Sequence, residues 1–497
     1  MLPFPREFAA RIPRAVLRLA VLLSAACNGT DSWSAPMSAV LQGEEIAQAS
    51  TAAAVPVASA AECRVVFPTS SPICPQEAVD SITASELLAH VQYLSDDERA
   101  GREAGTPGGQ ASGEYIAAQL RELRVPAAGP DREYFQPFGK GYRNVLAMIE
   151  GSDPEAANEV IVVGAHYDHV GHGSRKTEGA AAEIRNGADD NASGVAAALE
   201  IAEAMSQLAR VPRRSLLFAF WDAEEKGLLG SRHWVTNPTF PVERVAAVIN
   251  LDMVGRLRDN TLIVWGTASA PGWRELIANH NTSLNLLIDF RPKVLTKSDH
   301  YSLFVKGIPA LFPTTGIHPQ LHRPDDDVKL IDADGMQRVT QLVQRIAYDM
   351  ADRSDRLSFR EAARNELETN PAKKEELPAP RPTDENCRFG ISCRREESEP
   401  NARVVVAVAA DTPAALAGLA PADRICAVGD IWVTESLDLG RILADAAGPV
   451  PVIVERNGQF LTLSLDAERG TRKVPDVLDS TGDPRAVKEG PPPQTDP

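Results

Sequence analysis

The stretch that decides the fold of this chain is a polar turn, Asn186-Gly187-Ala188-Asp189-Asp190-Asn191-Ala192-Ser193-Gly194. Upstream, residues 160–163 are all β-branched, which is typical of a buried strand. Downstream, apolar residues between 192 and 208 recur at helical spacing. The sequence therefore predicts a strand, an Asp-rich turn and a helix in succession.

Two further apolar runs also end in acidic residues. Residues 215–221 are followed by Asp222-Ala223-Glu224-Glu225, and residues 245–251 by Asp252. We interpret both runs as buried strands of the same parallel sheet. Ligands of open α/β sheets bind outside the carboxyl ends of the strands. We therefore expect these acidic groups to gather with His166 at one edge of the sheet.

Strands and helices alternate over about 270 residues, which predicts a single three-layer α/β/α domain with a mostly parallel central sheet. A proline-rich, charged segment then separates it from a smaller β-rich domain. The predicted order is an export signal, a linker, the α/β domain, a charged linker, the β-rich domain and a disordered tail. Their bounds are 1–27, 28–80, 81–353, 354–385, 386–469 and 470–497.

The first residues have the pattern of an export signal. Four arginines precede the apolar core 19–26, which is too short to span a bilayer. The segment Ser24-Ala25-Ala26-Cys27 resembles the cleavage site of a bacterial lipoprotein, so both lipidation at Cys27 and simple secretion are open. We expect an exported protein that is periplasmic, lipid-anchored or secreted, with membrane contact only through an N-terminal lipid.

The net charge of −17 over 497 residues argues against a general nucleic-acid surface, because phosphate binding needs clustered Lys and Arg. The acidity also has a local meaning at the sheet edge. Carboxylates that share one pocket repel one another unless a cation is present. The composition is therefore compatible with a metal site.

Five side chains are the candidate metal ligands: His166, Asp189, Glu225, Asp252 and His322. Two imidazoles and three carboxylates suit zinc, with manganese or cobalt as substitutes. Five ligands are too many for one tetrahedral ion with an open position, but two ions that share a bridging carboxylate would use them all. We therefore predict a two-metal centre.

The neighbours of these ligands have expected roles as well. Adjacent side chains diverge, so one of Glu224 and Glu225 can bind metal while the other acts as a general base. Asp168, two residues after His166, can accept the N–H of that imidazole and fix its tautomer. Asp190 is expected beside the ligands rather than among them.

At this point the sequence resembles a known family, the dizinc aminopeptidases of the bacterial leucyl aminopeptidase and aminopeptidase Y type, which are zinc exopeptidases. The resemblance covers roughly residues 85 to 350. The matching segments are 164–168, 186–194, 220–231, 250–253, 298–300 and 322–324.

The resemblance implies a role for each candidate. His166 and Asp252 would hold one zinc, Glu225 and His322 the other, and Asp189 would bridge them. Glu224 would be the general base and Asp168 the partner of His166. A hydroxide bridging the two Zn²⁺ would attack the peptide carbonyl of a substrate with a free N-terminus. A carboxypeptidase, a glutaminyl cyclase or a non-catalytic binding protein on this scaffold are the alternatives.

One position departs from the family. Many members have Tyr immediately before the last ligand, where it stabilises the oxyanion, and this chain has Leu321. Tyr301 or His300 is a candidate replacement, and stabilisation of the oxyanion by zinc alone is the alternative. Asp299 and His318 are further candidates beside the ligands or the substrate.

The smaller domain resembles a PDZ domain of the bacterial protease-associated kind, on the residues 410–419, 422–425 and 428–430. The resemblance implies a loop whose backbone N–H groups bind the C-terminal carboxylate of a protein tail. The matching residues are Phe389, Gly390, Ile391 and Ser392. A packing module without a ligand is the alternative.

Overall fold

The structure is a computed structural model, and it describes residues 72–172, 183–373, 389–445 and 448–466. The predicted export signal, most of the first linker, part of the second linker and the C-terminal tail lie outside these residues.

The larger domain is built on an eight-stranded sheet. Its strand order is β1-β2-β4-β3-β5-β9-β6-β7. The strands β3, β4, β5 and β9 run parallel to one another, while β1, β2 and the pair β6–β9 contribute antiparallel contacts. The predicted parallel sheet is therefore the centre of a mixed sheet. The strand bounds are β1 (Phe135–Phe138), β2 (Tyr142–Ile149), β3 (Val160–His166), β4 (Ser215–Trp221), β5 (Val245–Asn250), β6 (Thr261–Trp265), β7 (Leu287–Arg291) and β9 (Ala310–Thr314).

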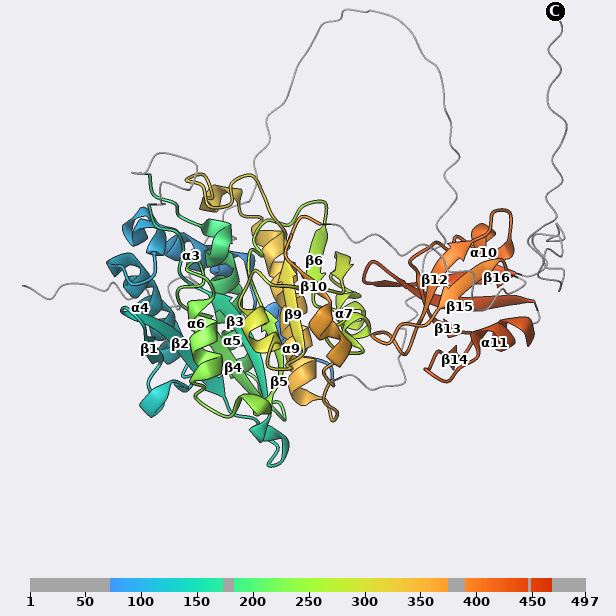
Figure 1. The fold of residues 1–497 in the computed structure, drawn as a ribbon, viewed down its shortest axis with the longest axis horizontal. Coiled ribbons are helices and arrows are strands. Elements are labelled where there is room, and N and C mark those ends of the chain that lie inside the picture. The colour runs from blue at the N-terminus through green and yellow to red at the C-terminus, as the bar shows by residue number, and fades with distance from the viewer. Residues whose placement is uncertain (1–71, 173–182, 374–388, 446–447, 467–497) are drawn as a thin grey trace, which may run out of the picture. The chain divides into compact units, whose positions relative to one another are not determined.

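Helices cover both faces of the sheet, as the prediction of an α/β/α domain requires (Figure 1). Every residue of β3 is buried, and successive side chains point to opposite faces. Thus Ile161 and Val163 belong to one apolar core, and Val162 belongs to the other. The first core packs under α3 (Ala84–Leu94), α4 (Pro107–Glu122), α5 (Gly194–Ser206), α7 (Trp273–Asn281) and α9 (Ala333–Asp352), and the second under α6 (Leu229–Thr236) and α8 (His300–Phe304).

The ordered chain extends beyond both predicted ends of this domain. Helix α2 (Gln76–Asp80) carries buried Ala78 and Val79, and Nε2 of Gln344 in α9 donates to the carbonyl of Ala78 over 3.1 Å. At the other end, β10 (Leu367–Glu368) pairs with β8 (Val294–Leu295). These segments are too short to show a periodicity, so the sequence pattern could not separate them from linker.

The C-terminal region forms its own β-rich unit with a separate apolar core that includes Phe389, Ile425 and Val452. Asn457 and Gly458 form a hairpin turn, because both residues have positive φ and the flanking Arg456 and Gln459 pair. Its elements are β11 (Ile391–Arg394), β12 (Arg403–Val408), α10 (Pro413–Leu416), β13 (Arg424–Val428), β14 (Ile431–Trp432), α11 (Leu439–Asp445), β15 (Pro449–Arg456) and β16 (Gln459–Asp466).

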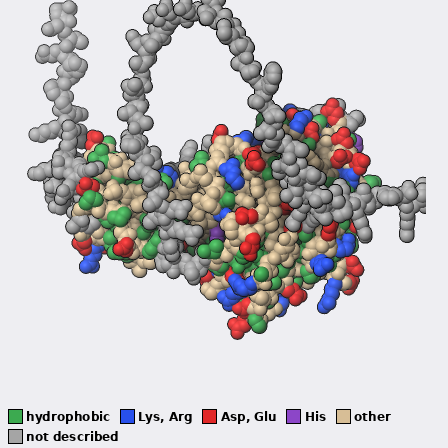
Figure 2. Space-filling model, turned by 180° about the vertical axis from the view of Figure 1, so that it is seen from behind, with side chains coloured by type: hydrophobic (Ala, Val, Ile, Leu, Met, Phe, Trp, Pro, Cys, Tyr) green, Lys and Arg blue, Asp and Glu red, His purple; other side chains and the backbone are tan. Residues whose placement is uncertain are grey.

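The surface agrees with the composition. Acidic and basic side chains are interspersed over the face seen in Figure 2. Among the helices that the structure describes, none combines the length and the apolar character needed to cross a bilayer.

Candidate metal centre

The carboxyl ends of three parallel strands bring the predicted residues to one edge of the sheet. Strand β3 ends at His166, which pairs in register with Trp221 at the end of β4. Gly164 of β3 pairs with Asn250 at the end of β5. Residues that follow β4 and β5 by a few positions therefore lie near His166, as the sequence predicted.

The Asp-rich turn between β3 and α5 is tied to these strand ends by Asn191. Its amide nitrogen donates to the carbonyl of Leu251 over 2.9 Å. Its amide oxygen accepts from the backbone N–H groups of Gly194 over 2.9 Å and Met253 over 3.2 Å. The turn, the start of α5 and the chain after β5 are thus held together by one buried side chain.

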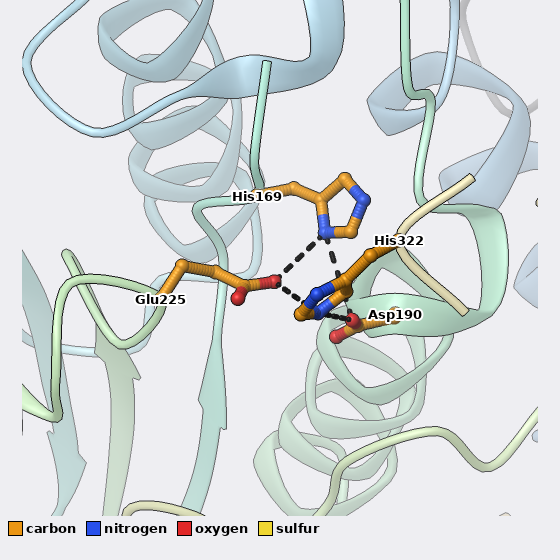
Figure 3. A group of neighbouring side chains, drawn as sticks. All are labelled: His169, Asp190, Glu225 and His322. Atoms are coloured by element: carbon orange, nitrogen blue, oxygen red, sulfur yellow. Dashed lines mark hydrogen bonds and ion pairs between the residues drawn. The ribbon is translucent and has the colours of Figure 1, made fainter. Parts of the chain in front are cut away.

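The first group of ligand atoms comes from His169, Asp190, Glu225 and His322 (Figure 3). Nδ1 of His169 and Nε2 of His322 lie 3.0 and 3.1 Å from Oε1 of Glu225. Nε2 of His322 also lies 2.9 Å from Oδ2 of Asp190. Two imidazoles and two carboxylates facing one point are a donor set that suits zinc.

The second group comes from His166, Asp190 and Asp252. Nε2 of His166 lies 3.3 Å from Oδ1 of Asp190 and 3.4 Å from Oδ1 of Asp252. The two oxygens of Asp190 thus face different groups, which is what a carboxylate bridging two cations must do.

The structure corrects the position of the shared carboxylate, which the sequence analysis gave to Asp189. Oδ1 of Asp189 accepts from the N–H of Gly255 over 2.7 Å, and its Oδ2 lies 3.2 Å from Nε2 of His318. Asp189 precedes Asp190 directly, and the turn directs their side chains to different sides. Asp190, which was expected beside the ligands, therefore lies in both groups of candidate ligand atoms, and Asp189, the expected bridging residue, supports the turn.

His169 is the member of the groups that was expected from the sequence at the mouth of the site and not as a ligand. Its signal was its place in the segment His166-Tyr167-Asp168-His169, directly after a buried strand. The ring is buried, with the whole residue 1% exposed.

Asp168 lies next to His166, and its carboxylate also accepts hydrogen bonds from the backbone after β4. Nδ1 of His166 lies 3.1 Å from the backbone carbonyl oxygen of Asp168 and 3.8 Å from its carboxylate. The carboxylate accepts the backbone N–H groups of Glu224 over 2.9 Å and Glu225 over 3.4 Å. Asp168 therefore fixes the turn that carries the two adjacent acids.

The two adjacent acids, Glu224 and Glu225, have pKa values shifted in opposite directions. Burial raises the pKa of Glu224 well above its usual value; the nearby His166 opposes this shift, and the carboxylates of Asp299 and Asp252 reinforce it. Burial acts in the same direction on Glu225, but the imidazoles of His169 and His322 outweigh it and lower the pKa to about 2. Glu225 is thus a ready anionic ligand, and Glu224 is an acid that holds a proton easily.

The imidazoles respond to the same charges. Burial alone would lower the pKa of His322, but hydrogen bonds with Asp190 and Glu225 raise it to about 11. Burial alone would also lower the pKa of His166. The neighbouring carboxylates of Asp252 and Glu224 outweigh burial and raise this pKa well above its usual value. The carboxylates at this edge of the sheet therefore favour the protonated forms of His166 and His322.

The remaining candidates lie around these groups with definite contacts. The buried Asp299 has a pKa raised to about 7 by burial. The buried ring of His300 stacks on Phe312 at 4.8 Å between centroids, and burial lowers its pKa to about 3. The ring of Tyr301 stacks on Phe304.

His318 and Leu321 lie on the loop that leads to His322. Nη1 of Arg256 lies 2.9 Å from Nδ1 of His318, on the opposite side of that ring from Asp189. Leu321 is half-buried. His318 therefore supports Asp189 rather than a metal group.

Sequence comparison agrees with this fold and site. Residues 144–347 match the model of Peptidase family M28. This segment contains both ligand groups and Glu224. The α/β domain is therefore similar, over these residues, to the members of a peptidase family.

Individual relatives cover part of the chain. Leupeptin-inactivating enzyme 1 of Streptomyces exfoliatus is 30% identical over 264 residues, which are 52% of this chain and 53% of that protein. The solved LapA aminopeptidase of Legionella pneumophila aligns with 56% of this chain and 74% of its own, at 21% identity and a TM-score of 0.47. The glutaminyl cyclase of Porphyromonas gingivalis aligns with 53% and 97%, at 23% identity and a TM-score of 0.44. The chain thus spans about half the length of the Streptomyces relative.

Proposed function

We propose that the chain is a zinc-dependent aminopeptidase whose centre holds two Zn²⁺ ions, with Mn²⁺ or Co²⁺ as substitutes. The observation that carries the proposal is the placement of Asp190, whose two carboxylate oxygens face two separate sets of ligand atoms. His166 and Asp252 would hold one ion, Glu225 and His322 the other. Bound there, two divalent cations would polarise a carbonyl group and neutralise developing negative charge.

The chain's own residues would manage the proton. Glu224 is buried among acids and has a raised pKa, so it suits a group that takes a proton from water and returns it to the leaving amine. Asp168 holds the backbone of Glu224 in place through a 2.9 Å hydrogen bond. The substrate in this proposal is a peptide with a free N-terminus.

The oxyanion position stays without an assigned side chain. The rings of His300 and Tyr301 stack on Phe312 and Phe304 respectively, and Leu321 has no polar group. We therefore give none of these three residues the role that Tyr has in many members of the family.

The test is hydrolysis of aminoacyl-arylamides and short peptides by the full chain, with Glu224→Gln as the central variant. We expect this variant to keep its zinc and to lose hydrolysis by at least about 10²-fold, as for a general base. Glu200→Gln is the matched control, because Glu200 is also buried and its pKa is also raised by burial. Full activity in Glu224→Gln would refute the assignment.

The substrate class is tested in the same assay. N-acetylated peptides should be inert if a free amine is required. Release of the C-terminal residue from N-blocked peptides would favour the carboxypeptidase alternative, and pyroglutamate formed from Gln-peptides the cyclase. A protein that binds these peptides without any turnover would be a binding protein on this scaffold.

Two further parts of the proposal concern the flanking regions. We propose export on the pattern of residues 1–27, with Cys27 as the site of a lipid if the protein is anchored. We also propose that the segment Phe389–Ser392, whose last two residues begin β11, binds the C-terminal carboxylate of a protein tail. In support, Gly390 has φ +77, and a Cβ there would lie 2.3 Å from Thr412, so the tight loop needs glycine. Titration of the full chain with C-terminal peptides tests this, and an amidated peptide of the same sequence is the control that should not bind.

A further inference from the structure

We propose that His169 is an additional metal ligand, so that four side chains enclose one ion and only three hold the other. This inference rests on the proposed function, because it concerns the same two-ion centre. It assigns the centre a closed half, formed by His169, Asp190, Glu225 and His322, and an open half, formed by His166, Asp190 and Asp252.

The spacing of the four atoms in the closed half fits a single ion. Ligand bonds of about 2.0 to 2.1 Å in a tetrahedron place neighbouring ligand atoms about 3.3 Å apart. Nδ1 of His169 lies 3.0 Å from Oε1 of Glu225 and 3.7 Å from Oδ2 of Asp190. Nε2 of His322 lies 3.1 and 2.9 Å from the same two oxygens. His169 occupies the fourth corner of this arrangement (Figure 3).

The position of the ring is built into the fold. Gly187 has φ +57, and a Cβ on it would lie 2.5 Å from Cδ2 of His169. The turn that carries Asp190 therefore approaches the imidazole too closely for a side chain at Gly187. The backbone N–H of His169 donates to the carbonyl of Arg102 over 3.3 Å. The ring is thus fixed with Nδ1 directed at two carboxylates.

The two halves then differ in the way that separates structural from catalytic zinc sites. Sites with four protein ligands are closed, whereas catalytic sites have three and keep a position for water or substrate. The open half has three protein ligands, His166, Asp190 and Asp252, and so keeps a position for water or substrate.

A simpler reading is that His169 only donates a hydrogen bond to Glu225. Two isosteric variants of the full chain separate the readings. Asn in His169→Asn still offers an N–H near the position of Nδ1, but its amide is a poor zinc ligand. Asp in His169→Asp offers a ligating carboxylate at the same position. His280→Gln is the matched control, because His280 is also buried beside a carboxylate, Asp349, in a different part of the fold.

The measurements are zinc stoichiometry, zinc affinity in a competition titration and the visible spectrum of the Co²⁺-loaded protein. We expect His169→Asn to weaken the binding of one of the two ions by more than about 100-fold. Loss of a residue that only hydrogen-bonds to a ligand typically weakens metal binding by about 10- to 100-fold. In His169→Asn, the spectral bands of one four-coordinate Co²⁺ should weaken as well. His169→Asp should restore much of the zinc affinity and of the Co²⁺ spectral bands, and His280→Gln should change neither quantity.

The wild-type protein gives a second, independent reading by X-ray absorption at the zinc edge. Three imidazoles shared by two ions support the proposal, and two imidazoles overturn it even if the variants fail to fold. Two tightly bound ions in His169→Asn would also overturn it and leave the two-ion centre intact. A wild-type protein that binds fewer than two ions would instead refute the centre itself, and with it the proposed function.

Discussion

Arg102 should control the affinity of the metal centre without touching a metal. The side chain is fully buried, and Nε and Nη2 donate to the carbonyls of Tyr167 over 2.9 Å, Gly187 over 2.7 Å and Asp190 over 3.0 Å. Nη1 also bonds to the carbonyl of Asn186. These carbonyls belong to the end of β3 and to the turn that carries the shared carboxylate. We predict that Arg102→Lys will weaken metal binding as well as the fold.

The magnitude follows from the number of donors. With the carbonyl of Leu94, which lies 3.4 Å from Nη1, the guanidinium reaches five carbonyls. An ammonium has three donors on one atom, so at least two carbonyls are left without a partner. Each unsatisfied buried carbonyl costs about 1–3 kcal/mol, which gives a loss of about 2–6 kcal/mol in the free energy of unfolding. A domain in the upper part of the usual stability range of about 5–15 kcal/mol would still fold. The displaced turn should reduce metal affinity about 10- to 100-fold.

The assay is a zinc competition titration beside urea unfolding of the metal-free protein. The matched control is Arg214→Lys. Arg214 is also buried and donates to the carbonyls of Arg353 over 2.6 Å and Met350 over 3.3 Å, but it lies just before β4, at the opposite edge of the sheet. Both variants should lose stability, and only Arg102→Lys should lose affinity. Equal zinc affinities in the two variants would refute the reasoning.

Three further predictions follow from the site. Asp190→Asn should release both ions, whereas Asp189→Asn should retain them with weakened affinity; metal analysis by mass spectrometry decides between these, and the reverse result would restore the original assignment. The pKa values of His166 and His322 are raised in the metal-free site, so zinc binding at pH 7 should release about two protons and zinc affinity should rise with pH. Calorimetry in buffers of different ionisation enthalpy measures the protons released, and no proton release would contradict the prediction. Burial and, after it, the charge of the Asp168 carboxylate raise the pKa of Asp222 from 3.8 to about 7. The contribution of the protonated Asp222 to the free energy of unfolding is therefore fully present below about pH 4 and is lost as the pH rises through about 7. This loss is at most about 4 kcal/mol. Urea unfolding in a chelator should therefore be less pH-dependent in Asp222→Asn, and an unchanged pH dependence would show that the group is not responsible.

The sheet and its functional edge were predictable from the sequence because both depend on long apolar runs. The runs at 160–163, 215–221 and 245–251 became β3, β4 and β5 in parallel register. The ends of parallel strands meet at one edge wherever the connecting chain goes. A local pattern was therefore enough to bring His166, Glu225 and Asp252 together.

The choice between Asp189 and Asp190 depends on contacts that no local pattern contains. Asp189 is drawn to the N–H of Gly255 and to His318, and Asp326 accepts the backbone N–H groups of both aspartates. These partners lie more than 60 residues further along the chain. Two adjacent residues of the same type in a turn are indistinguishable until such partners are in place.

Arg102 and the role of Asp168 were missed for a related reason. Both act on the backbone, through the carbonyls of the turn and the N–H groups of Glu224 and Glu225. A ligand can be recognised by its chemical type, because zinc accepts few kinds of atom. A residue that holds a backbone in place can be almost any donor or acceptor, and only its neighbours in the fold identify it.

The charges at the sheet edge explain how three carboxylates can lie close together without a bound cation. Asp190, Glu225 and Asp252 would repel one another in a bare pocket, but the raised pKa values of His166 and His322 place protons between them. The raised pKa of Glu224 and the fully buried guanidinium of Arg102 relieve the remaining repulsion. Protons thus occupy the positions of positive charge that divalent ions would take over.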